Sequence, residues 1–445
     1  MADAQKSDRA DRLEFCFELG ARLQTMLDVE TALADAVASA GLIPAFAAAA
    51  IRPAGQVEHY DTAAIESEAR AAGNLAIPLV RHLTQRVASS DPAAARYVHW
   101  GATSQDIIDT ALVLQLRRAV PIVVDDLTLA ADAAAEHARR HAATPMAGRT
   151  WLQQATPITF GLKAAGWLDA LDRVRASLQT ALDGALVLQL GGAAGTLSAF
   201  GNQGIAVADA IGKALTLPVP SLPWHAHRDR LATLACALGV ATGCAGKIAR
   251  DLGLLAQTEV AEAHEPAADA GGSSSMPQKQ NPVRAAIAIA AAVRAPGLVA
   301  TMLSAMPQEH ERGLGGWQAE WDTMPQLVMV AGDAASALAG ALQALVVDPA
   351  RMRANLEITK GLVFAEAVTM GLAPRLGKEE AHARVARAAR RASDERRPFL
   401  DLLCENPAVT AILNRSEIET LLSSQASRGS AAAFVARALA RHGEK

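Results

Sequence analysis

The segment from Gly271 to Pro282 carries the side chains best suited to chemistry. It reads GGSSSMPQKQNP, so two glycines and three serines precede Lys279 and Asn281. Glycines permit positive φ angles and hinge motion, and hydroxyls, backbone N–H groups and an ammonium can together hold an anion. Composition alone also allows a polar connection between helices. The segment is predicted to be a loop that closes over an anionic substrate.

Long helices are expected to position this loop. The chain has 445 residues, of which 51% are hydrophobic and only 4% aromatic, and alanine supplies much of the apolar share. This composition favours packed helices over sheets, and apolar residues recur at spacings of three and four in five long segments. These segments are Asp106–His141, Thr156–Leu190, Asp229–Ala263, Pro282–Leu303 and Trp321–Val347. The sequence therefore predicts an all-α protein built around an extended helical bundle.

Glycines and prolines divide the chain into three predicted helical domains. Residues 1–102 contain frequent turn signals, which predict short helices in an N-terminal domain. Residues 103–347 hold the central bundle, and residues 348–445 form a C-terminal domain. The long segments are joined by irregular connections at 144–155, 191–204, 216–228, 265–281 and 305–316.

The charge balance excludes several classes of partner. Lys and Arg number 42 and Asp and Glu 46, a formal net charge of −4, so the basic footprint of a nucleic-acid-binding protein is absent. The first residues lack the apolar core of a secretory signal, and polar residues interrupt the apolar stretch Leu327–Val347. Four scattered cysteines without a CxxC motif are typical of a reducing compartment. We expect a cytoplasmic protein that binds neither nucleic acid nor membranes.

Residues 272–282 resemble the signature GSSxMPxKxNP of the fumarase/aspartase superfamily at every fixed position. Two more segments expected of that superfamily follow in the right order upstream. They are HWGATSQD at residues 99–106 and GRTWLQ at residues 148–153. The resemblance extends over essentially the whole chain. It implies a homotetramer with a core of twenty helices, in which each active site combines the three segments from three subunits.

The resemblance also implies roles for the loop residues. Ser273 would be the general base that removes or returns a proton on the carbon next to a carboxylate, while Lys279 and Asn281 hold that carboxylate. A serine hydroxyl is a poor base unless its anion is stabilised. Loop N–H groups and the Lys279 ammonium would therefore have to lower the pKa of Ser273 when the loop is closed.

Two positions depart from the pattern of most lyases in this superfamily. Those lyases have a histidine after Gly-Arg-Thr and a glutamate five residues after the loop asparagine, and this pair handles the proton of the leaving group. Here the two positions are Trp151 and Ala286. An amine or hydroxyl leaving group needs that proton, whereas a carboxylate of pKa about 4 does not. The departure predicts a reaction in which the group added or expelled is itself a carboxylate.

Lactone formation has this chemistry, and the sequence resembles the lactonising branch of the superfamily. The similarity lies in GRTWLQ, in His310–Arg312 and in Trp317–Trp321. The branch adds one carboxylate of an unsaturated tricarboxylate to a double bond. The resemblance implies that Ser273 or Lys279 delivers the proton, a choice that stays open, and that Lys279 also stabilises the aci-carboxylate.

A tricarboxylate substrate needs several cations and hydrogen-bond donors. The predicted cations are Arg149, Lys279 and Arg312, and the predicted donors are His99, Thr103, Ser104, Thr150, Gln153 and Asn281. Trp151 would supply an apolar wall that shapes the folded substrate. Two alternatives stay open: Trp151 could fill space in a core, and Arg312 could form an exposed ion pair with Glu311.

Other motifs do not indicate a metal or a cofactor. His225 and His227 form an HxH pair, but no third ligand lies at a suitable spacing nearby. Glu259, Glu262 and Glu265 share a helix face without the Glu-x-x-His repeats of di-iron sites. The glycine-rich segments at 191–195 and 313–316 match neither GxGxxG nor a P-loop. We expect an enzyme without a bound metal or nucleotide cofactor.

Two other functions are considered. HWGATSQD and the segment Asn355–Ala367 also resemble the adenylosuccinate lyases, which release fumarate by β-elimination, but Trp151 and Ala286 argue against that reaction. A third possibility is a lyase fold that has lost catalysis and serves as a binding or structural component. The intact Ser273, Lys279 and Asn281 argue against it.

Overall fold

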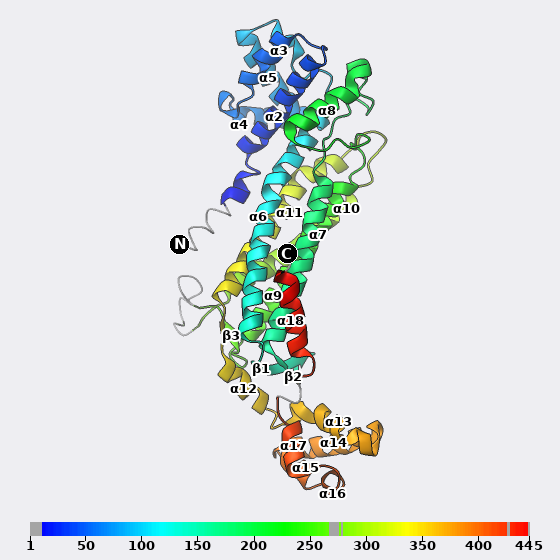
Figure 1. Cartoon of the computed structure of the whole chain (residues 1–445). Coiled ribbons are helices and arrows are strands. Elements are labelled where there is room, and N and C mark those ends of the chain that lie inside the picture. The colour runs from blue at the N-terminus through cyan, green and yellow to red at the C-terminus, as the bar shows by residue number, and fades with distance from the viewer. Residues whose placement is uncertain (1–10, 267–275, 277–278, 425–427, 444–445) are drawn as a thin grey trace. The chain divides into compact units, whose positions relative to one another are not determined.

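The computed structural model describes residues 11–266, 276, 279–424 and 428–443, and it confirms an all-α protein (Figure 1). Five long helices lie close to the five predicted segments. They are α6 (Ser104–Arg140), α7 (Phe160–Ala185), α9 (Asp229–Leu255), α10 (Val283–Ser304) and α11 (Gly316–Ala344). The largest difference is at α9, which ends at Leu255 instead of Ala263, and α7 runs from Phe160 to Ala185 instead of from Thr156 to Leu190.

The chain divides into two compact units. Unit 1 contains the described residues up to Asp126, together with Val174–Gly243 and Ala290–Ser336. Unit 2 contains Leu127–Arg173, Cys244–Ile289 and the described residues from Ala337 onward. Each of the five long helices contributes residues to both units. The division into three domains at residues 102 and 347 stays a prediction.

Short helices pack together in unit 1. They are α2 (Leu19–Ser39), α3 (Ala45–Ile51), α4 (Thr62–Ala72), α5 (Ala76–Ser90) and α8 (Gly204–Leu215). Helix α2 contacts α3 and α8, and α4 contacts α5 (Figure 1). The carboxylate of Asp61 accepts a hydrogen bond from the backbone of Ala64 and caps α4, and Gly73 ends that helix in the left-handed conformation.

A β-hairpin replaces part of the irregular connection expected before α7. Strand β1 (Pro145–Thr150) pairs antiparallel with β2 (Gln153–Thr159), and a bulge lies next to Gly148. A Cβ at Gly148 would lie 2.6 Å from the carbonyl oxygen of Thr156, so the bulge needs glycine. The prediction of helix from Thr156 was wrong because these residues complete their backbone hydrogen bonds across the hairpin.

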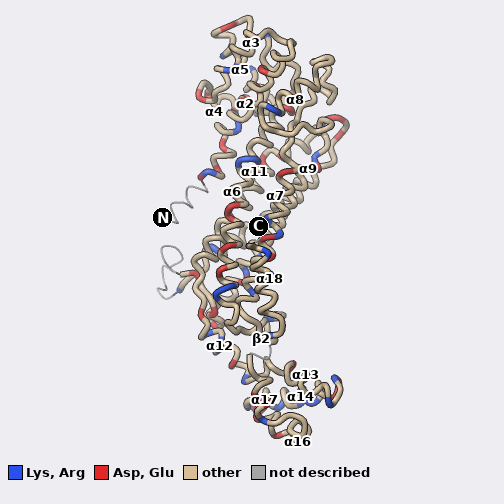
Figure 2. Tube along the Cα trace, in the orientation of Figure 1, with Lys and Arg blue, Asp and Glu red and all other residues tan. Residues whose placement is uncertain are grey.

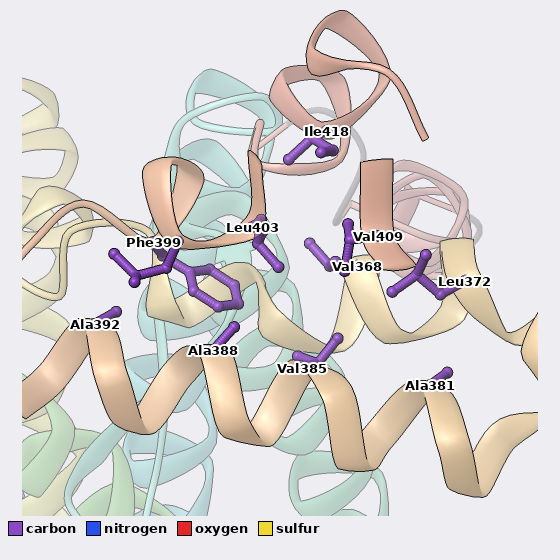
Figure 3. Packing of buried hydrophobic residues seen from close by; sticks show 11 residues of the cluster. Val368, Leu372, Ala381, Val385, Ala388, Ala392, Phe399, Leu403, Val409 and Ile418 are labelled. Atoms are coloured by element: carbon purple, nitrogen blue, oxygen red, sulfur yellow. The ribbon is translucent and has the colours of Figure 1, made fainter. Parts of the chain in front are cut away.

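A second two-stranded sheet joins β3 (Ala263–His264) to β4 (Val346–Val347). Seven α-helices follow β4 in the described part of unit 2. They are α12 (Pro349–Glu357), α13 (Ala365–Leu376), α14 (Lys378–Asp394), α15 (Phe399–Cys404), α16 (Pro407–Thr410), α17 (Arg415–Leu421) and α18 (Ala431–Gly443). Residues from α13 to α17 share a small core around Phe399, Val385 and Leu372 (Figure 3).

Lys and Arg are interspersed with Asp and Glu along the described trace (Figure 2). Among the described helices, α9, α10 and α11 are long and apolar enough to cross a membrane by length and composition alone. In the most apolar 18-residue stretch of each helix, the buried share is 56% in α9, 67% in α11 and only 22% in α10. Helix α10 therefore leaves much apolar surface uncovered in a single chain.

Candidate active site

The first predicted segment forms a turn that leads into α6. His99 and Gly101 adopt left-handed φ angles of 58° and 76°. A Cβ at Gly101 would lie 2.4 Å from the ring of Phe200, so this position needs glycine for both conformation and space. The turn places Thr103 and Ser104, both half-buried, at the N-terminus of α6.

Asp106, a residue that the sequence analysis did not single out, anchors this turn. Its fully buried carboxylate accepts hydrogen bonds from the backbone N–H of Thr103 at 3.0 Å and from Gly191 and Gly192 at 2.9 and 3.0 Å. It also lies 2.7 Å from Nε2 of buried His225. Four groups thus contact one carboxylate. These contacts fix the turn against the loop that contains Gly191 and Gly192 and against the loop that contains His225.

Arg312 lies beside this turn and contacts two of its residues. Its Nη2 donates to Oγ1 of Thr103 at 2.6 Å, and its Nε donates to Oε1 of Gln105 at 3.4 Å. Gln105 is buried and donates in turn to the carboxylate of Asp109 at 3.1 Å. Arg312 is therefore held by polar contacts and is still partly exposed.

A buried ionic network lies next to Gln105. Arg228 donates to both carboxylate oxygens of Asp109 at 2.7 and 3.0 Å and to Glu320 at 2.6 to 3.1 Å. Trp317 Nε1 also donates to Asp109 at 2.9 Å. Burial raises the pKa of the Glu320 carboxyl, although Arg228 offsets part of this effect. The network joins α6, α11 and the residue before α9 within unit 1.

The second predicted segment lies at the tip of the hairpin in unit 2. Trp151 and Leu152 are 94% and 81% exposed and have left-handed φ angles of 53° and 63°. Thr150 and Gln153, which flank them, are exposed as well. In a single chain, then, Trp151 is not a core residue, which excludes the alternative of a space-filling side chain.

Arg149 is engaged within its own chain. Its two terminal nitrogens donate to the two carboxylate oxygens of Glu262 at 2.8 and 2.7 Å. Glu262 is fully buried and also accepts a hydrogen bond from Asn355 at 2.8 Å. A bidentate pair of this kind orients the hairpin strongly, and it leaves Arg149 with less capacity to bind a substrate carboxylate.

The third segment is described in part. The predicted base Ser273 lies outside the described residues. Lys279 is exposed, and Asn281 is half-buried where the chain enters α10. The carboxylate of Glu265 accepts hydrogen bonds from the backbone N–H groups of Arg284 and Ala285 and so caps α10. Ala286 follows in the first turn and is exposed.

Each unit gathers one set of the predicted residues. Unit 1 contains His99, Thr103, Ser104 and Arg312, and unit 2 contains Arg149, Thr150, Trp151, Gln153, Lys279 and Asn281. Two buried carboxylates that hold these residues in place, Asp106 and Glu262, were not predicted to do so. Asp106 lies within HWGATSQD and Glu262 lies within a triplet of glutamates. Their partners are far away in the sequence, so no local spacing of residues reveals these contacts.

The chain is similar to known proteins over most of its length. Residues 4–297 match the family described as lyase, and residues 361–438 match the family described as adenylosuccinate lyase C-terminus. The chain is 52% identical over 422 residues to the 3-carboxy-cis,cis-muconate cycloisomerase of Pseudomonas aeruginosa, covering 95% of this chain and 92% of that protein. It is 42% identical over 426 residues to the nitrosuccinate lyase of Streptomyces davaonensis, covering 94% of this chain and 90% of that protein.

A solved structure gives the same result. The crystal structure of 3-carboxy-cis,cis-muconate lactonizing enzyme from Pseudomonas putida is 48% identical to this chain and covers 97% of both chains with a TM-score of 0.91. A class II fumarase from Schistosoma mansoni shares the fold at 16% identity, with a TM-score of 0.78. The predicted family is therefore confirmed. The chain belongs to the lyase family and is an enzyme of the fumarase/aspartase superfamily.

Proposed function

We propose that this protein is a 3-carboxy-cis,cis-muconate cycloisomerase, which forms 4-carboxymuconolactone in the protocatechuate branch of the β-ketoadipate pathway. The relatives of highest identity named above carry this activity in their names. The loop residues Ser273, Lys279 and Asn281 are all present. The proposal also accounts for the two departures from the pattern of most lyases.

The reaction needs one new bond and one proton. A carboxylate oxygen of the substrate attacks a carbon β to another carboxylate, the double bond opens, and its electron pair moves onto the carbon next to that carboxylate. Lys279 and Asn281 hold this carboxylate and stabilise its aci form. Ser273 or Lys279 then protonates the carbanion. The substrate has three carboxylates and the product has two, so each turnover takes up one proton.

The observation that carries the proposal is that Trp151 and Ala286 together replace the histidine and the glutamate of most lyases. Both side chains are exposed in the chain, so neither replacement is explained by packing in the core of the subunit. Ala286 has no proton to donate, and the indole N–H of Trp151 is far too weak an acid to protonate a leaving group. A substrate carboxylate needs none, because its pKa of about 4 keeps it ionised.

The remaining predicted residues recognise the substrate. Arg312 contacts Thr103, and this pair offers a charge and a hydroxyl at one place in unit 1. His99 and Ser104 add donors there, and Thr150, Gln153 and Arg149 add donors from the hairpin. Trp151 forms the apolar wall. Because Arg149 is already paired with Glu262, we assign its main contribution to holding the hairpin.

We also propose a soluble, cytoplasmic homotetramer whose sites combine segments from three subunits. The apolar surface of α10 supports this, because Ile287, Val293 and Leu303 are 46%, 69% and 45% exposed in a single chain. Surface of that kind is typical of a subunit interface. Dilution to monomers should abolish the activity, as sedimentation at falling subunit concentration would show. A monomer with full activity would contradict the shared site.

The function is tested by adding 3-carboxy-cis,cis-muconate to the purified protein and following the loss of its conjugated-diene absorbance. No metal or nucleotide is added. Rapid loss is expected in the wild type, and Ser273→Ala and Lys279→Ala should each slow it by about 10²- to 10⁴-fold. Muconate left untouched by the wild-type protein would refute the proposal.

The second candidate is a β-eliminating lyase, such as an adenylosuccinate-lyase-like enzyme that releases fumarate. The match of residues 361–438 to the adenylosuccinate lyase C-terminus and the similarity to nitrosuccinate lyase favour it. Adenylosuccinate and nitrosuccinate are therefore supplied in parallel assays. Turnover of either one, without turnover of the muconate, would replace the first proposal.

A further inference from the structure

One buried carboxylate in unit 1 has no role in the proposed reaction. Glu30 lies on α2, and its side chain is 1% exposed. Its Oε1 lies 2.6 Å from Nδ1 of His99, whose side chain is 21% exposed. Among the described residues, His99 is the only ion-pair partner shown for Glu30. A glutamate far from the three motif segments therefore contacts the first residue of one of them.

Burial makes this contact obligatory. An ionised carboxylate removed from water is costly unless a cation or several donors compensate it, and an imidazolium Nδ1–H supplies both charge and hydrogen bond. The left-handed φ of 58° at His99 is an uncommon conformation for a residue other than glycine, and the ring of His99 contacts Glu30 of α2. With Nδ1 directed at Glu30, Nε2 is the nitrogen that remains for another ligand.

The charged groups that act on His99 come from two elements. They are Glu30 of α2 and Asp106 of α6, and both are negative. Burial favours the neutral ring, but these two charges and the hydrogen bond to Glu30 outweigh it, so the pKa of His99 is raised. Four residues after His99, Thr103 carries the contact to Arg312.

We propose that Glu30 is a positioning residue, which holds His99 as an imidazolium with its Nε2–H directed to a carboxylate of the substrate. The predicted site residues of unit 1 would then include a second cation in addition to Arg312. The contact between His99 and a substrate carboxylate rests on the proposed function. The contact between Glu30 and His99 does not.

The pair is tested in the absence of substrate by NMR. The protein is labelled with 13C-histidine, the signal of His99 is assigned from its loss in His99→Gln, and the ring is titrated in the protein as purified. The pKa of His99 should fall in Glu30→Gln and should recover in part in Glu30→Asp, which keeps the charge. Asp35→Asn is the matched control, because Asp35 lies on the same helix and pairs on the surface with Arg52. It should leave the titration unchanged.

The kinetic consequence is a change in KM. Because the pKa of His99 is raised, the wild-type protein keeps this cation above the ordinary imidazole range and loses it as the pH rises through the shifted value. Glu30→Gln should raise KM for the muconate about tenfold near neutral pH, with a smaller change in kcat, and the difference should vanish at high pH.

Each result has one meaning. A His99 titration in Glu30→Gln identical to that of the wild type would overturn the pairing, whatever the activity. A lowered pKa with an unchanged KM profile would overturn the substrate contact of His99. If the wild type does not consume the muconate at all, the proposed function fails, and the titration still decides the pairing. If Glu30→Gln does not fold, the Glu30→Asp titration and the KM profile of His99→Gln decide in its place.

Discussion

At the scale of single residues, Trp151 is proposed as the apolar wall of the site and lies at the tip of the hairpin. Its side chain is almost fully exposed in the chain, so it contributes little to the fold of the subunit. Its left-handed φ, together with that of Leu152, forms a two-residue turn in which Asn and Gly are far more common. A strained backbone at a turn that exposes a tryptophan side chain indicates a functional position.

Trp151→Ala separates stability from activity. Since little of this side chain is buried in the subunit, the free energy of unfolding of the subunit should change by less than about 0.5 kcal/mol. Loss of the apolar wall should lower kcat/KM by at least about tenfold, equal to about 1.4 kcal/mol of transition-state stabilisation. Urea unfolding and steady-state rates measure the two effects. A large loss of stability with normal kcat/KM would contradict the assignment.

Gly101 gives a sharper test of the turn that carries His99. Gly101→Ala combines a positive φ with a Cβ placed 2.4 Å from Phe200, so it should cost more than about 2 kcal/mol and most of the activity. Gly73→Ala is the control. Gly73 also has a positive φ, 83°, but nothing lies within 4 Å of its added Cβ, and the cost should be about 1 kcal/mol. Equal effects of the two substitutions would show that the space beside Phe200 does not matter.

The site residues that sequence could predict are those in ordered motifs. Ser273, Lys279 and Asn281 follow one another in a recognisable signature. Glu30 and Arg228 could not be found in the same way, because a single charged residue in a helical pattern normally lies on the surface. Only the fold shows that Glu30 and Arg228 are buried and which residues they pair with.

At the scale of elements, the helices of unit 1 are joined by the ionic network around Arg228. Asp109 lies on α6 and Glu320 on α11, and Arg228 precedes α9. The ring of Trp224 lies 4.7 Å from the guanidinium carbon, which completes the enclosure of this cation. The network thus holds the N-terminal end of α6 and, through Gln105, supports Arg312.

Arg228→Met should be among the most damaging single substitutions. It leaves two buried carboxylates without their cation, which costs about 3 to 5 kcal/mol. Arg415→Ala is the control, since it removes an exposed pair with Glu419 worth less than about 1 kcal/mol. Urea midpoints at one fixed subunit concentration compare the two variants. Similar losses in both would mean that the buried network contributes no more than a surface pair.

The long helices were predictable because their apolar spacing is regular over many turns. The hairpin was not, because its strands are short, contain Pro145 and Pro157, and depend on pairing with each other. The same limit applies to α15 and α16, which are only one or two turns long. For elements of this length, tertiary contacts determine whether the segment forms a helix or a strand, and the local sequence pattern does not.

At the scale of the whole molecule, the proposed tetramer predicts complementation between inactive variants. Ser273→Ala damages the loop segment, and Arg312→Met damages the site formed around Thr103. If these segments meet from different subunits, mixed tetramers contain some sites with neither change. Co-expression should therefore give more activity than either variant alone, measured with the muconate assay. Mixed tetramers no more active than the separate variants would place the loop segment and the residues around Thr103 of one site in the same subunit.

The most direct test of the central claim is to identify the product formed from 3-carboxy-cis,cis-muconate in D₂O by NMR. Intramolecular addition predicts a lactone with one deuterium on the carbon next to a carboxylate, formed with uptake of one hydron per molecule. An unchanged substrate, or an open-chain product without the lactone ring, would contradict the account and would mean that Trp151 and Ala286 belong to a different chemistry.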